Sequence, residues 1–232
     1  MKCIRSNYNK FYNSQNHTFL YPTEFVVRIF LANYQGMSFQ KPKSGSKILD
    51  LGFGDGRNTA FLCQQKLDVY GIEITREIVD KTDFRLKQLG WSANLSVGDN
   101  QNIPFDDRFF EYVLACHSMY YCLDGSKFED NLFEYLRVMK PGAWLIASIA
   151  NEDSLLFKNS TKTERGTFII NNDPYNNRNG TELFAVKSYD EIEEKFSPHF
   201  ENFSFGSSKC SYFGHSDESV FWVTCQKKIL ES

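Results

Sequence analysis

Three glycines, at positions 52, 54 and 56, mark the segment of this chain with the clearest chemical potential, residues 50–57 (DLGFGDGR). Glycine adopts backbone conformations that other residues avoid, and its missing side chain lets a ligand approach the main chain closely. A helix that begins behind such a turn also presents free N–H groups. The turn is not a dinucleotide fingerprint, which needs glycine where Arg57 stands, and it is not a phosphate loop of the G-x-x-x-x-G-K-[ST] type. An ordinary strand-to-helix turn is the alternative interpretation.

Acidic side chains stand at the ends of neighbouring predicted strands. Glu73 ends the second strand, where a carboxylate can accept hydrogen bonds from both hydroxyls of a ribose. Asp99 follows the third strand, where it can accept from an adenine amino group, with the apolar residues 103–105 beside the ring. Each acid alone is compatible with a solvated strand end. Together with Asp50, they predict a nucleoside-like ligand beside the glycine turn.

The segment after the fourth predicted strand, residues 116–121 (CHSMYY), offers candidate catalytic side chains. An unperturbed histidine has a pKa of about 6.5, so His117 would be largely neutral at pH 7 and could act as a general base. Tyr120 and Tyr121 could present rings or hydroxyls to a substrate. Packing stays open as the alternative for all three, with His117 satisfied by hydrogen bonds and both tyrosines in the core.

The elements that must position these residues alternate between strands and helices. Apolar runs rich in β-branched residues predict strands at 47–51, 67–74, 93–97, 111–116 and 144–149. Alternation with helices gives right-handed βαβ units, so the fold class is α/β, a doubly wound, Rossmann-like sheet with helices on both faces. Two late strands, at 200–213 and 220–226, predict an antiparallel edge.

Helix signals separate the predicted strands. A helix is predicted at 59–65, and another begins at a Thr75 cap and uses Phe84 among its apolar positions. Ser126 and Glu129 predict a capping box for a third helix, which carries Phe133 and ends at residues 140–142. A second capping box, Ser188 with Glu191, predicts a helix before the late strands.

Residues 45–150 resemble the class I S-adenosylmethionine-dependent methyltransferases, especially their small-molecule branch. The resemblance lies in residues 49–59 (LDLGFGDGRNT), 71–74 (GIEI), 98–99, 103–105, 109–113 (FFEYV) and 136–143 (LRVMKPGA). It implies a seven-stranded sheet of order 3-2-1-4-5-7-6 with an antiparallel strand 7, and S-adenosylmethionine as the cofactor. One departure is Phe53, where the family often has cysteine or serine.

The resemblance also implies roles for single residues. Gly52, Phe53 and Gly54 would approach the methionine part of the cofactor, Glu73 would bind the ribose, and Asp99 with Asn100 would hold the adenine. Asp50 would orient the glycine turn or reach the cofactor ammonium group through water. The complete set of predicted cofactor contacts is Asp50, Gly52, Phe53, Gly54, Arg57, Asn58, Glu73, Ile74, Asp99, Asn100, Gln101, Cys116 and His117.

The chain divides into a predicted N-terminal helical arm or lid, residues 1–45, and a methyltransferase domain, residues 46–232. Polar turns predict a substrate-side insertion at about 151–187. A helix within 21–31 would cover the cofactor, as N-terminal helices do in relatives. The weak substrate candidates are Tyr21, Arg28, Tyr175 and Arg178. A surface position for Arg28 and turn roles for the two residues of the insertion are the alternatives.

The resemblance implies a methyl transfer by in-line displacement, for which a protein supplies mainly alignment and a dry site. A base is needed only where the acceptor must lose a proton. The predicted acceptor is an oxygen or nitrogen of a small molecule, such as a metabolite, a sugar or a cell-envelope precursor. A non-catalytic module that binds S-adenosylmethionine or another nucleotide is one alternative. A nicotinamide-dependent oxidoreductase is the other, and Arg57 and Asp99 argue against it.

Composition narrows the function classes further. The 232 residues carry 26 Lys+Arg and 29 Asp+Glu, a formal charge of −3, which gives no reason to expect a nucleic-acid partner. The six cysteines show no metal-binding spacing, so no metal site is predicted. No apolar run approaches the roughly 20 residues of a membrane span, and no signal peptide is recognisable. We expect a cytoplasmic monomer or homodimer without a membrane partner.

Overall fold

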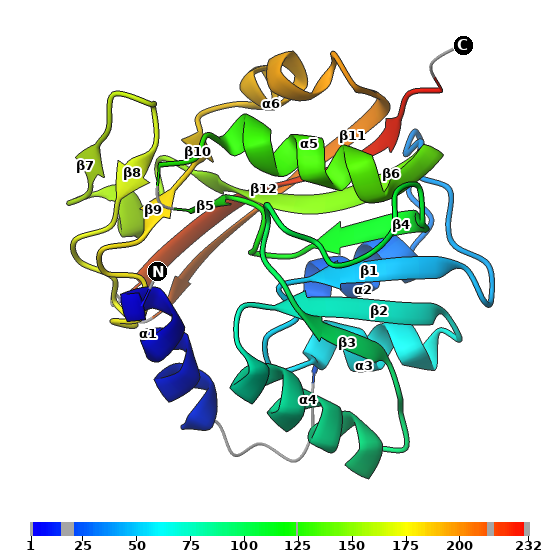
Figure 1. Cartoon of the computed structure of the whole chain (residues 1–232). Coiled ribbons are helices and arrows are strands. Elements are labelled where there is room, and N and C mark those ends of the chain that lie inside the picture. Colours follow the sequence, from blue (N-terminus) through cyan, green and yellow to red (C-terminus); the bar gives the residue numbers. More distant parts are fainter. Residues whose placement is uncertain (1, 15–20, 124, 213–215, 230–232) are drawn as a thin grey trace.

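The computed structural model describes residues 2–14, 21–123, 125–212 and 216–229, and a twisted sheet lies at its centre (Figure 1). Seven strands run in the order β11-β12-β6-β4-β1-β2-β3, and a short strand, β10, also pairs with β6. β12 is antiparallel to β6 and to β11, while the strands from β6 to β3 are parallel. This confirms the predicted order. The bounds are Lys47–Leu51 (β1), Asp68–Glu73 (β2), Asn94–Val97 (β3), Phe110–Ala115 (β4), Met139–Asn151 (β6), Ala185–Val186 (β10), Phe200–Tyr212 (β11) and Ser216–Lys227 (β12).

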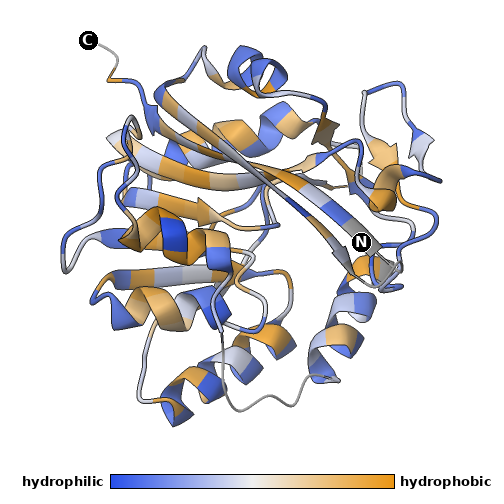
Figure 2. Cartoon of the chain, turned by 180° about the vertical axis from the view of Figure 1, so that it is seen from behind, coloured by the Kyte–Doolittle hydropathy of each residue, from blue (hydrophilic) through white to orange (hydrophobic). Residues whose placement is uncertain are grey.

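Helices cover both faces of this sheet because successive strand residues point to opposite sides. Ile48 packs in the apolar cluster with α2 (Glu24–Leu31) and α3 (Arg57–Gln64), whereas Leu49 packs in the cluster with α5 (Phe128–Val138) and α6 (Tyr189–Phe196). Figure 2 shows hydrophobic residues concentrated on the central strands and mixed with hydrophilic ones on the helices. None of the helices in the described ranges is both long and apolar enough to cross a membrane.

Two of the predicted helix caps are present. Thr75 precedes α4 (Arg76–Gln88), and its hydroxyl accepts a hydrogen bond from the Ile78 N–H at 3.3 Å. Ser188 precedes α6 and accepts from the Glu191 N–H at 3.3 Å. The Glu191 carboxylate accepts from the Lys187 N–H rather than from that of Ser188, so the second box is shifted by one residue. Both caps satisfy backbone donors that the first helical turn leaves unpaired.

The predicted capping box of α5, Ser126 with Glu129, is wrong by one position. The N-cap is Lys127, whose N–H donates to the Asp130 carboxylate at 2.8 Å. The Ser126 hydroxyl instead donates to the Leu123 carbonyl at 2.7 Å within the preceding turn. Several polar residues precede the helix, and the local turn decides which of them becomes the cap.

The strand β6 is longer than predicted. It begins at Met139, so residues 140–142, expected to form a turn between helix and strand, lie inside it. Met139 pairs with Phe110, and the register shifts before Tyr112 pairs with Trp144. Gly142 has a φ of 75°, which a residue with a side chain rarely adopts. The expected turn is therefore present only as an irregularity in the pairing of β6 with β4.

Two aromatic residues predicted on apolar helix faces are exposed. Phe84 of α4 is 63% exposed and Phe133 of α5 is 57% exposed. An amphipathic helix buries only one stripe against the sheet. Leu86 and Leu132 fill that stripe on the two helices, so their aromatic neighbours face outward.

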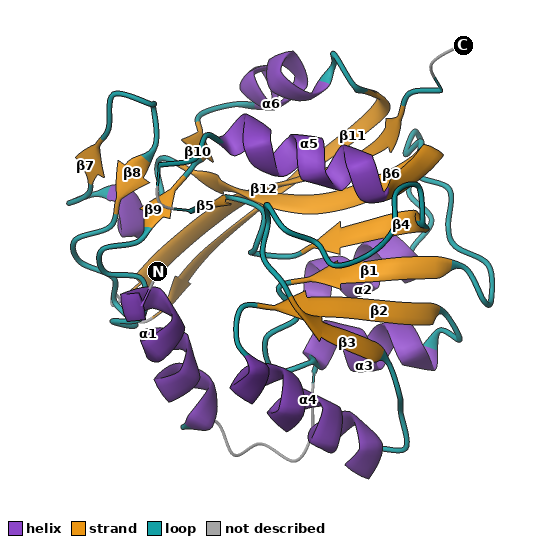
Figure 3. Ribbon diagram, in the orientation of Figure 1, coloured by secondary structure: helices purple, strands orange, loops and turns teal. Residues whose placement is uncertain are grey.

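The insertion between β6 and α6 forms a small second sheet, visible beside α1 in Figure 3. A short 3₁₀ helix, Leu155–Phe157, precedes β7 (Thr161–Lys162), β8 (Phe168–Ile169) and β9 (Glu182–Leu183). The fourth strand of this sheet is β5 (Tyr121–Cys122), which follows β4 in the chain and pairs with β9. The pairing of Tyr121 with Leu183 ties the candidate catalytic loop to the insertion.

Candidate active site

A cavity lies at the carboxyl ends of the parallel strands, between α1 (Lys2–Asn13) and the insertion. In a doubly wound sheet the strand ends form a natural ligand crevice. Ten predicted site residues line this cavity: Gly52, Glu73, Ile74, Asp99, Asn100, Cys116, His117, Tyr120, Tyr121 and Arg178. Residues from both the predicted cofactor set and the predicted catalytic set are therefore brought together.

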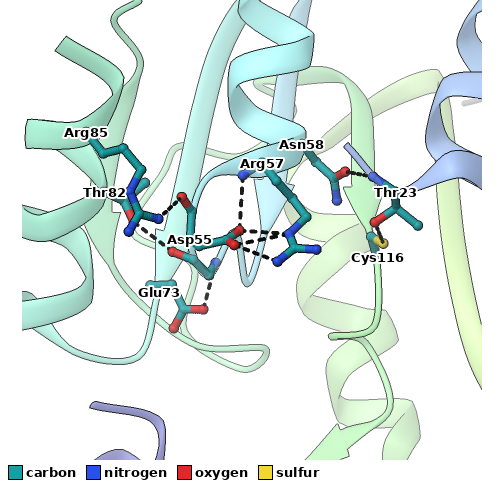
Figure 4. A network of polar contacts seen from close by, with 9 residues as sticks. Thr23, Asp55, Arg57, Asn58, Glu73, Thr82, Arg85 and Cys116 are labelled. Atoms are coloured by element: carbon teal, nitrogen blue, oxygen red, sulfur yellow. Dashed lines mark hydrogen bonds and ion pairs between the residues drawn. The ribbon is translucent and has the colours of Figure 1, made fainter. Parts of the chain in front are cut away.

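Hydrogen bonds to neighbouring elements fix the conformation of the glycine turn. Gly52 and Gly54 have φ values of 68° and 57°, in the left-handed region that favours glycine. The Thr82 hydroxyl donates to the Gly54 carbonyl at 2.7 Å, and the Gly54 N–H donates to Glu73 Oε1 at 3.0 Å (Figure 4). A Cβ on Gly52 would stand 2.7 Å from that of Ser118. The turn can therefore approach both the next strand and the loop after β4.

Glu73 is a buried carboxylate at the end of β2. Its Oε2 accepts from the Ile74 N–H at 2.8 Å, while Oε1 accepts from Gly54. Burial raises the pKa of Glu73 to about 7, although both backbone N–H groups favour the charged form. Each carboxylate oxygen can accept a further hydrogen bond, which is the capacity that a ribose diol requires.

Asp50 lies beneath the turn rather than in the cavity. Its Oδ2 accepts from the Thr59 hydroxyl at 2.7 Å, and the side chain is buried. Burial is the main cause that raises its pKa to about 7; the Thr59 hydrogen bond opposes this shift, and the nearby carboxylates of Glu73 and Asp55 contribute to it. This position fits the predicted role of orienting the glycine turn, because Thr59 belongs to the helix that follows.

Three predicted cofactor contacts are turned away from the cavity. Arg57 forms an ion pair with Asp55 at 2.6 Å, and Asn58 Oδ1 accepts from the Thr23 N–H at 3.0 Å (Figure 4). The Phe53 ring packs against Gly71 and α4, so only its backbone belongs to the turn. Gly54 is a fourth predicted contact outside the cavity lining, because the Tyr12 side chain occupies the space in front of it.

The predicted adenine segment is only partly in place. Asp99 and Asn100 line the cavity, and the Asn100 amide donates to the carbonyls of Ser118 and Tyr121, both at 3.0 Å. Gln101 lies outside, with its N–H donating to Asp99 Oδ1 at 3.0 Å. The apolar residues 103–105 do not line the cavity, because Ile103 is in the core and Phe105 packs on Tyr70. Ile74 and Leu123 supply apolar lining instead.

His117 stands in a strained turn after β4. Its φ is 56°, its N–H donates to the Ser148 hydroxyl at 2.7 Å, and its Nδ1 lies 3.5 Å from the Tyr120 hydroxyl. The Glu218 carboxylate lies 3.8 Å from Nδ1. Burial lowers the pKa of His117, although Glu218 raises it, so the imidazole is neutral at pH 7. A neutral imidazole beside a carboxylate can accept a proton from a substrate.

The tyrosines and the cysteine near His117 are neutral. Burial raises the pKa of Tyr120 and Tyr121 above the ordinary tyrosine value. Burial likewise raises the pKa of the Cys116 thiol to about 12, and its sulfur lies 3.6 Å from the Thr23 hydroxyl. Cys116 is therefore no thiolate nucleophile at pH 7.

The helix α1 lines the cavity and belongs to the predicted N-terminal helical arm, residues 1–45, whereas the helix that we expected to cover the cofactor lies within 21–31. The helix predicted within 21–31, α2, packs with its buried residues Val26, Ile29 and Phe30 against the sheet. Tyr8 and Tyr12 of α1 line the cavity, and the hydroxyls of Tyr8 and Tyr121 are hydrogen-bonded. The alternation of polar and apolar residues along 2–13 could have predicted this amphipathic helix. The sequence prediction also missed Glu218, which lies on the antiparallel strand β12 and belongs to none of the motifs described above.

Of the four weak substrate candidates, only Arg178 reaches the cavity. Tyr21 is 79% exposed and Tyr175 is 54% exposed. Arg28 pairs with Glu24 at 2.6 Å on the outer side of α2. These three placements do not support contact with a substrate in this cavity.

The sheet order, the glycine turn after β1 and the acids after β2 and β3 are those of the class I S-adenosylmethionine-dependent methyltransferase fold. Residues 48–142 match the family described as "Methyltransferase domain". The chain is therefore similar to S-adenosylmethionine-dependent methyltransferases in its fold and, over residues 48–142, in its sequence.

Two curated relatives and one solved structure illustrate the similarity. The chain is 29% identical over 108 residues to O-methyltransferase cnsE of Penicillium expansum, covering 45% of this chain and 38% of that protein. It is 45% identical over 64 residues to a protein-L-isoaspartate O-methyltransferase of Christiangramia forsetii, covering 27% and 30%. The chain thus spans about a third of the length of these relatives. A Methanosarcina mazei structure titled as SAM-dependent methyltransferases superposes with a TM-score of 0.67 at 19% identity, covering 82% of this chain and 95% of that one.

The residues present fit S-adenosylmethionine. The glycine turn offers close backbone approach, Glu73 keeps free acceptor capacity, and Asp99 stands at the next strand end. The buried Ser118 hydroxyl, which also lines the cavity, has no hydrogen-bond partner in the described ranges. An orphaned buried hydroxyl of this kind indicates a ligand that completes the site.

Proposed function

We propose that this chain binds S-adenosylmethionine in the cavity and transfers its methyl group to an oxygen or nitrogen of a small molecule. The observation that carries the proposal is the convergence of Gly52, Glu73, Asp99 and His117 on one cavity. When bound, S-adenosylmethionine supplies a methyl group activated by the sulfonium charge.

The binding roles are those that the resemblance implies, and the positions of Gly52, Glu73 and Asp99 in the cavity lining support them. The Gly52–Gly54 backbone would approach the methionine part, Glu73 would accept from the ribose, and Asp99 would accept from the adenine amino group. Asp50 is a positioning residue, because it acts through Thr59 on the helix that follows the turn. The arm formed by residues 1–45 would act as a lid, with α1 excluding water from the site.

His117 is the proposed general base. Its neutral imidazole would accept the proton from the acceptor hydroxyl or amine, and Glu218 at 3.8 Å would stabilise the imidazolium that forms. The hydroxyl of Tyr120, 3.5 Å from Nδ1, would orient the ring or the acceptor. Tyr121 would help to shape the acceptor pocket.

Calorimetric titration with S-adenosylhomocysteine tests the cofactor assignment. We expect the wild-type protein to bind with micromolar affinity, and Glu73→Ala and Asp99→Ala each to weaken binding more than tenfold, because each substitution removes a carboxyl group that would accept hydrogen bonds from the cofactor. Asp68→Ala, at the opposite end of β2, is the matched control and should bind normally.

A parallel titration with NAD separates the alternatives. Binding of NAD in place of S-adenosylhomocysteine would favour an oxidoreductase and contradict the proposal. Tight binding of S-adenosylhomocysteine without turnover over a broad acceptor panel would favour a non-catalytic module.

A further inference from the structure

Arg178 is a largely buried cation in the wall of the cavity. It lies in the insertion, and its side chain is only 19% exposed. Arginine stays protonated at any physiological pH, so this side chain brings a permanent charge beside Tyr8, Tyr120 and Tyr121. Burial raises the pKa of each of these tyrosines, so none of them supplies a compensating negative charge.

The guanidinium group lacks a hydrogen-bond acceptor within the ranges that the structure describes. The nearest carboxylate, that of Asp173, lies 3.9 Å away, beyond hydrogen-bond distance. Asp173 already accepts the N–H groups of Asn177 and Arg178, both at 2.9 Å, and that of Tyr175 at 3.3 Å. The Tyr175 ring covers the guanidinium from 5.8 Å. Asp173 therefore holds the loop together, and the Arg178 donors remain available.

Two more polar atoms point to a ligand at the same wall. Asn177 Oδ1 and the Ser118 hydroxyl are buried, and neither has a hydrogen-bond partner among the described residues. Both residues line the cavity with Arg178. A buried polar atom without a partner is unfavourable, so a ligand that supplies an anion to Arg178 and a hydrogen-bond donor to Asn177 Oδ1 would be stabilised.

We propose that Arg178 binds an anionic group of the methyl acceptor, which is a small organic anion, a carboxylate or a phosphate ester, that also carries a hydroxyl or amino group. This inference rests on the proposed function, because it names the acceptor class of that same site. A guanidinium pairs with either oxyanion through two parallel hydrogen bonds. A cationic acceptor would meet a buried like charge, and a neutral one would leave the guanidinium with only the Asp173 carboxylate, 3.9 Å away, as a counter-charge.

The remaining acids of the cavity do not compete for Arg178. Glu218 lies beside His117, and Glu73 is bonded to Gly54 and Ile74. Asp99 accepts from the Gln101 N–H. Among the described residues, therefore, no carboxylate lies within hydrogen-bond distance of the Arg178 guanidinium.

The test uses the full-length protein saturated with S-adenosylhomocysteine and two matched probes, 4-hydroxybenzoate and its uncharged analogue 4-hydroxybenzamide. Inorganic phosphate is the third probe, and it distinguishes phosphate recognition from carboxylate recognition. We expect the wild type to bind at least one of the two anions at least tenfold more tightly than the amide. Arg178→Gln should lose this preference, and Arg178→Lys should retain part of it.

Arg165→Gln is the control, because Arg165 lies in the same insertion but is paired with Glu182 at 2.8 Å outside the cavity. This variant should keep the anion preference. Equal preference in Arg178→Gln and wild type, or the absence of any preference in the wild type, would overturn the inference. The affinity for S-adenosylhomocysteine, measured first on every variant, reports separately on the proposed function and on folding.

Discussion

At the scale of single residues, two buried carboxylates beside the glycine turn dominate the electrostatics of the site. Asp50 and Glu73 are both buried, and burial raises the pKa of each to about 7. Both accept hydrogen bonds from groups in or next to the turn. When they are ionised, these buried carboxylates therefore destabilise the folded state. Carboxyl groups with such raised pKa values are typical of binding sites.

Asp50→Asn tests this balance through pH. The pKa of Asp50 is higher in the folded chain, about 7, than its ordinary value of 3.8, so the folded state binds more protons between these values. The free energy of unfolding therefore falls as pH rises through this window. Asparagine does not titrate and can still accept from Thr59. We expect the stability of the variant relative to wild type to increase by about 2 to 3 kcal/mol from pH 5 to pH 8.

Urea unfolding without cofactor at several pH values measures this difference. Asp68→Asn, a substitution of a half-exposed acid at the start of β2, serves as the control. Parallel stability profiles for Asp50→Asn and wild type would show that the Asp50 carboxylate does not titrate in this range.

His117→Asn tests the proposed base. Asparagine tolerates the left-handed conformation that His117 adopts, with φ at 56°, but cannot accept a proton near neutral pH. We expect turnover of an identified acceptor to fall about 100-fold or more, with the affinity for S-adenosylhomocysteine changed little. In the wild type, turnover should persist at pH 6.5 and decrease only at lower pH, because burial lowers the pKa of the imidazole below its ordinary value of about 6.5 and only its neutral form accepts a proton. Near-normal turnover of the variant would remove His117 from this role.

At the scale of elements, α1 contacts α4 through polar side chains as well as through the packing of Tyr8 and Tyr12 on a small apolar cluster. The Asn9 amide donates to Glu77 at 2.6 Å, Asn13 also donates to Glu77, and the Thr75 hydroxyl donates to Asn9 at 2.6 Å. Tyr12 meanwhile lies against Gly54. Exposed polar contacts are worth little individually, so α1 can separate from α4 without unfolding the sheet.

Glu77→Ala should therefore loosen the lid. It removes both asparagine contacts without touching the cavity, so we expect S-adenosylhomocysteine to dissociate several-fold faster, as followed by stopped-flow fluorescence. Asp80→Ala is the control on the same helix, because Asp80 is exposed and pairs only loosely with Arg76, at 3.9 Å. Equal dissociation rates for Glu77→Ala and wild type would contradict a lid function of α1.

At the scale of the whole molecule, the site is assembled from segments that are distant in sequence. The glycine turn and the strand-end acids come from the parallel half of the sheet, Glu218 from β12 and Arg178 from the insertion. The β5–β9 pairing joins these halves, since Tyr121 is opposite Leu183. The proposed cofactor and acceptor sites thus belong to different parts of one continuous structure.

The cofactor half was accessible from sequence because its signals are local. A parallel strand that ends in a glycine turn or an acid places that residue at the same edge of the sheet as its neighbours. The predicted strands, their order and the lining by Glu73 and Asp99 depend on this rule. Local signals predicted individual contacts less well. The ring of Phe53 and residues 103–105 belong to segments predicted to bind the cofactor, but they do not line the cavity.

The tertiary structure alone decided the acceptor half. Tyr8, Tyr12 and Glu218 lie on elements whose sequence shows only amphipathic periodicity or strand alternation, and nothing local indicates which cavity they meet. The same holds for Arg178, a turn residue in sequence that packing makes a buried cation. Sequence by itself determined the sheet and its cofactor edge, because backbone periodicity and strand-end chemistry are short-range. The lid and the acceptor wall depend on long-range packing, which only the folded chain specifies.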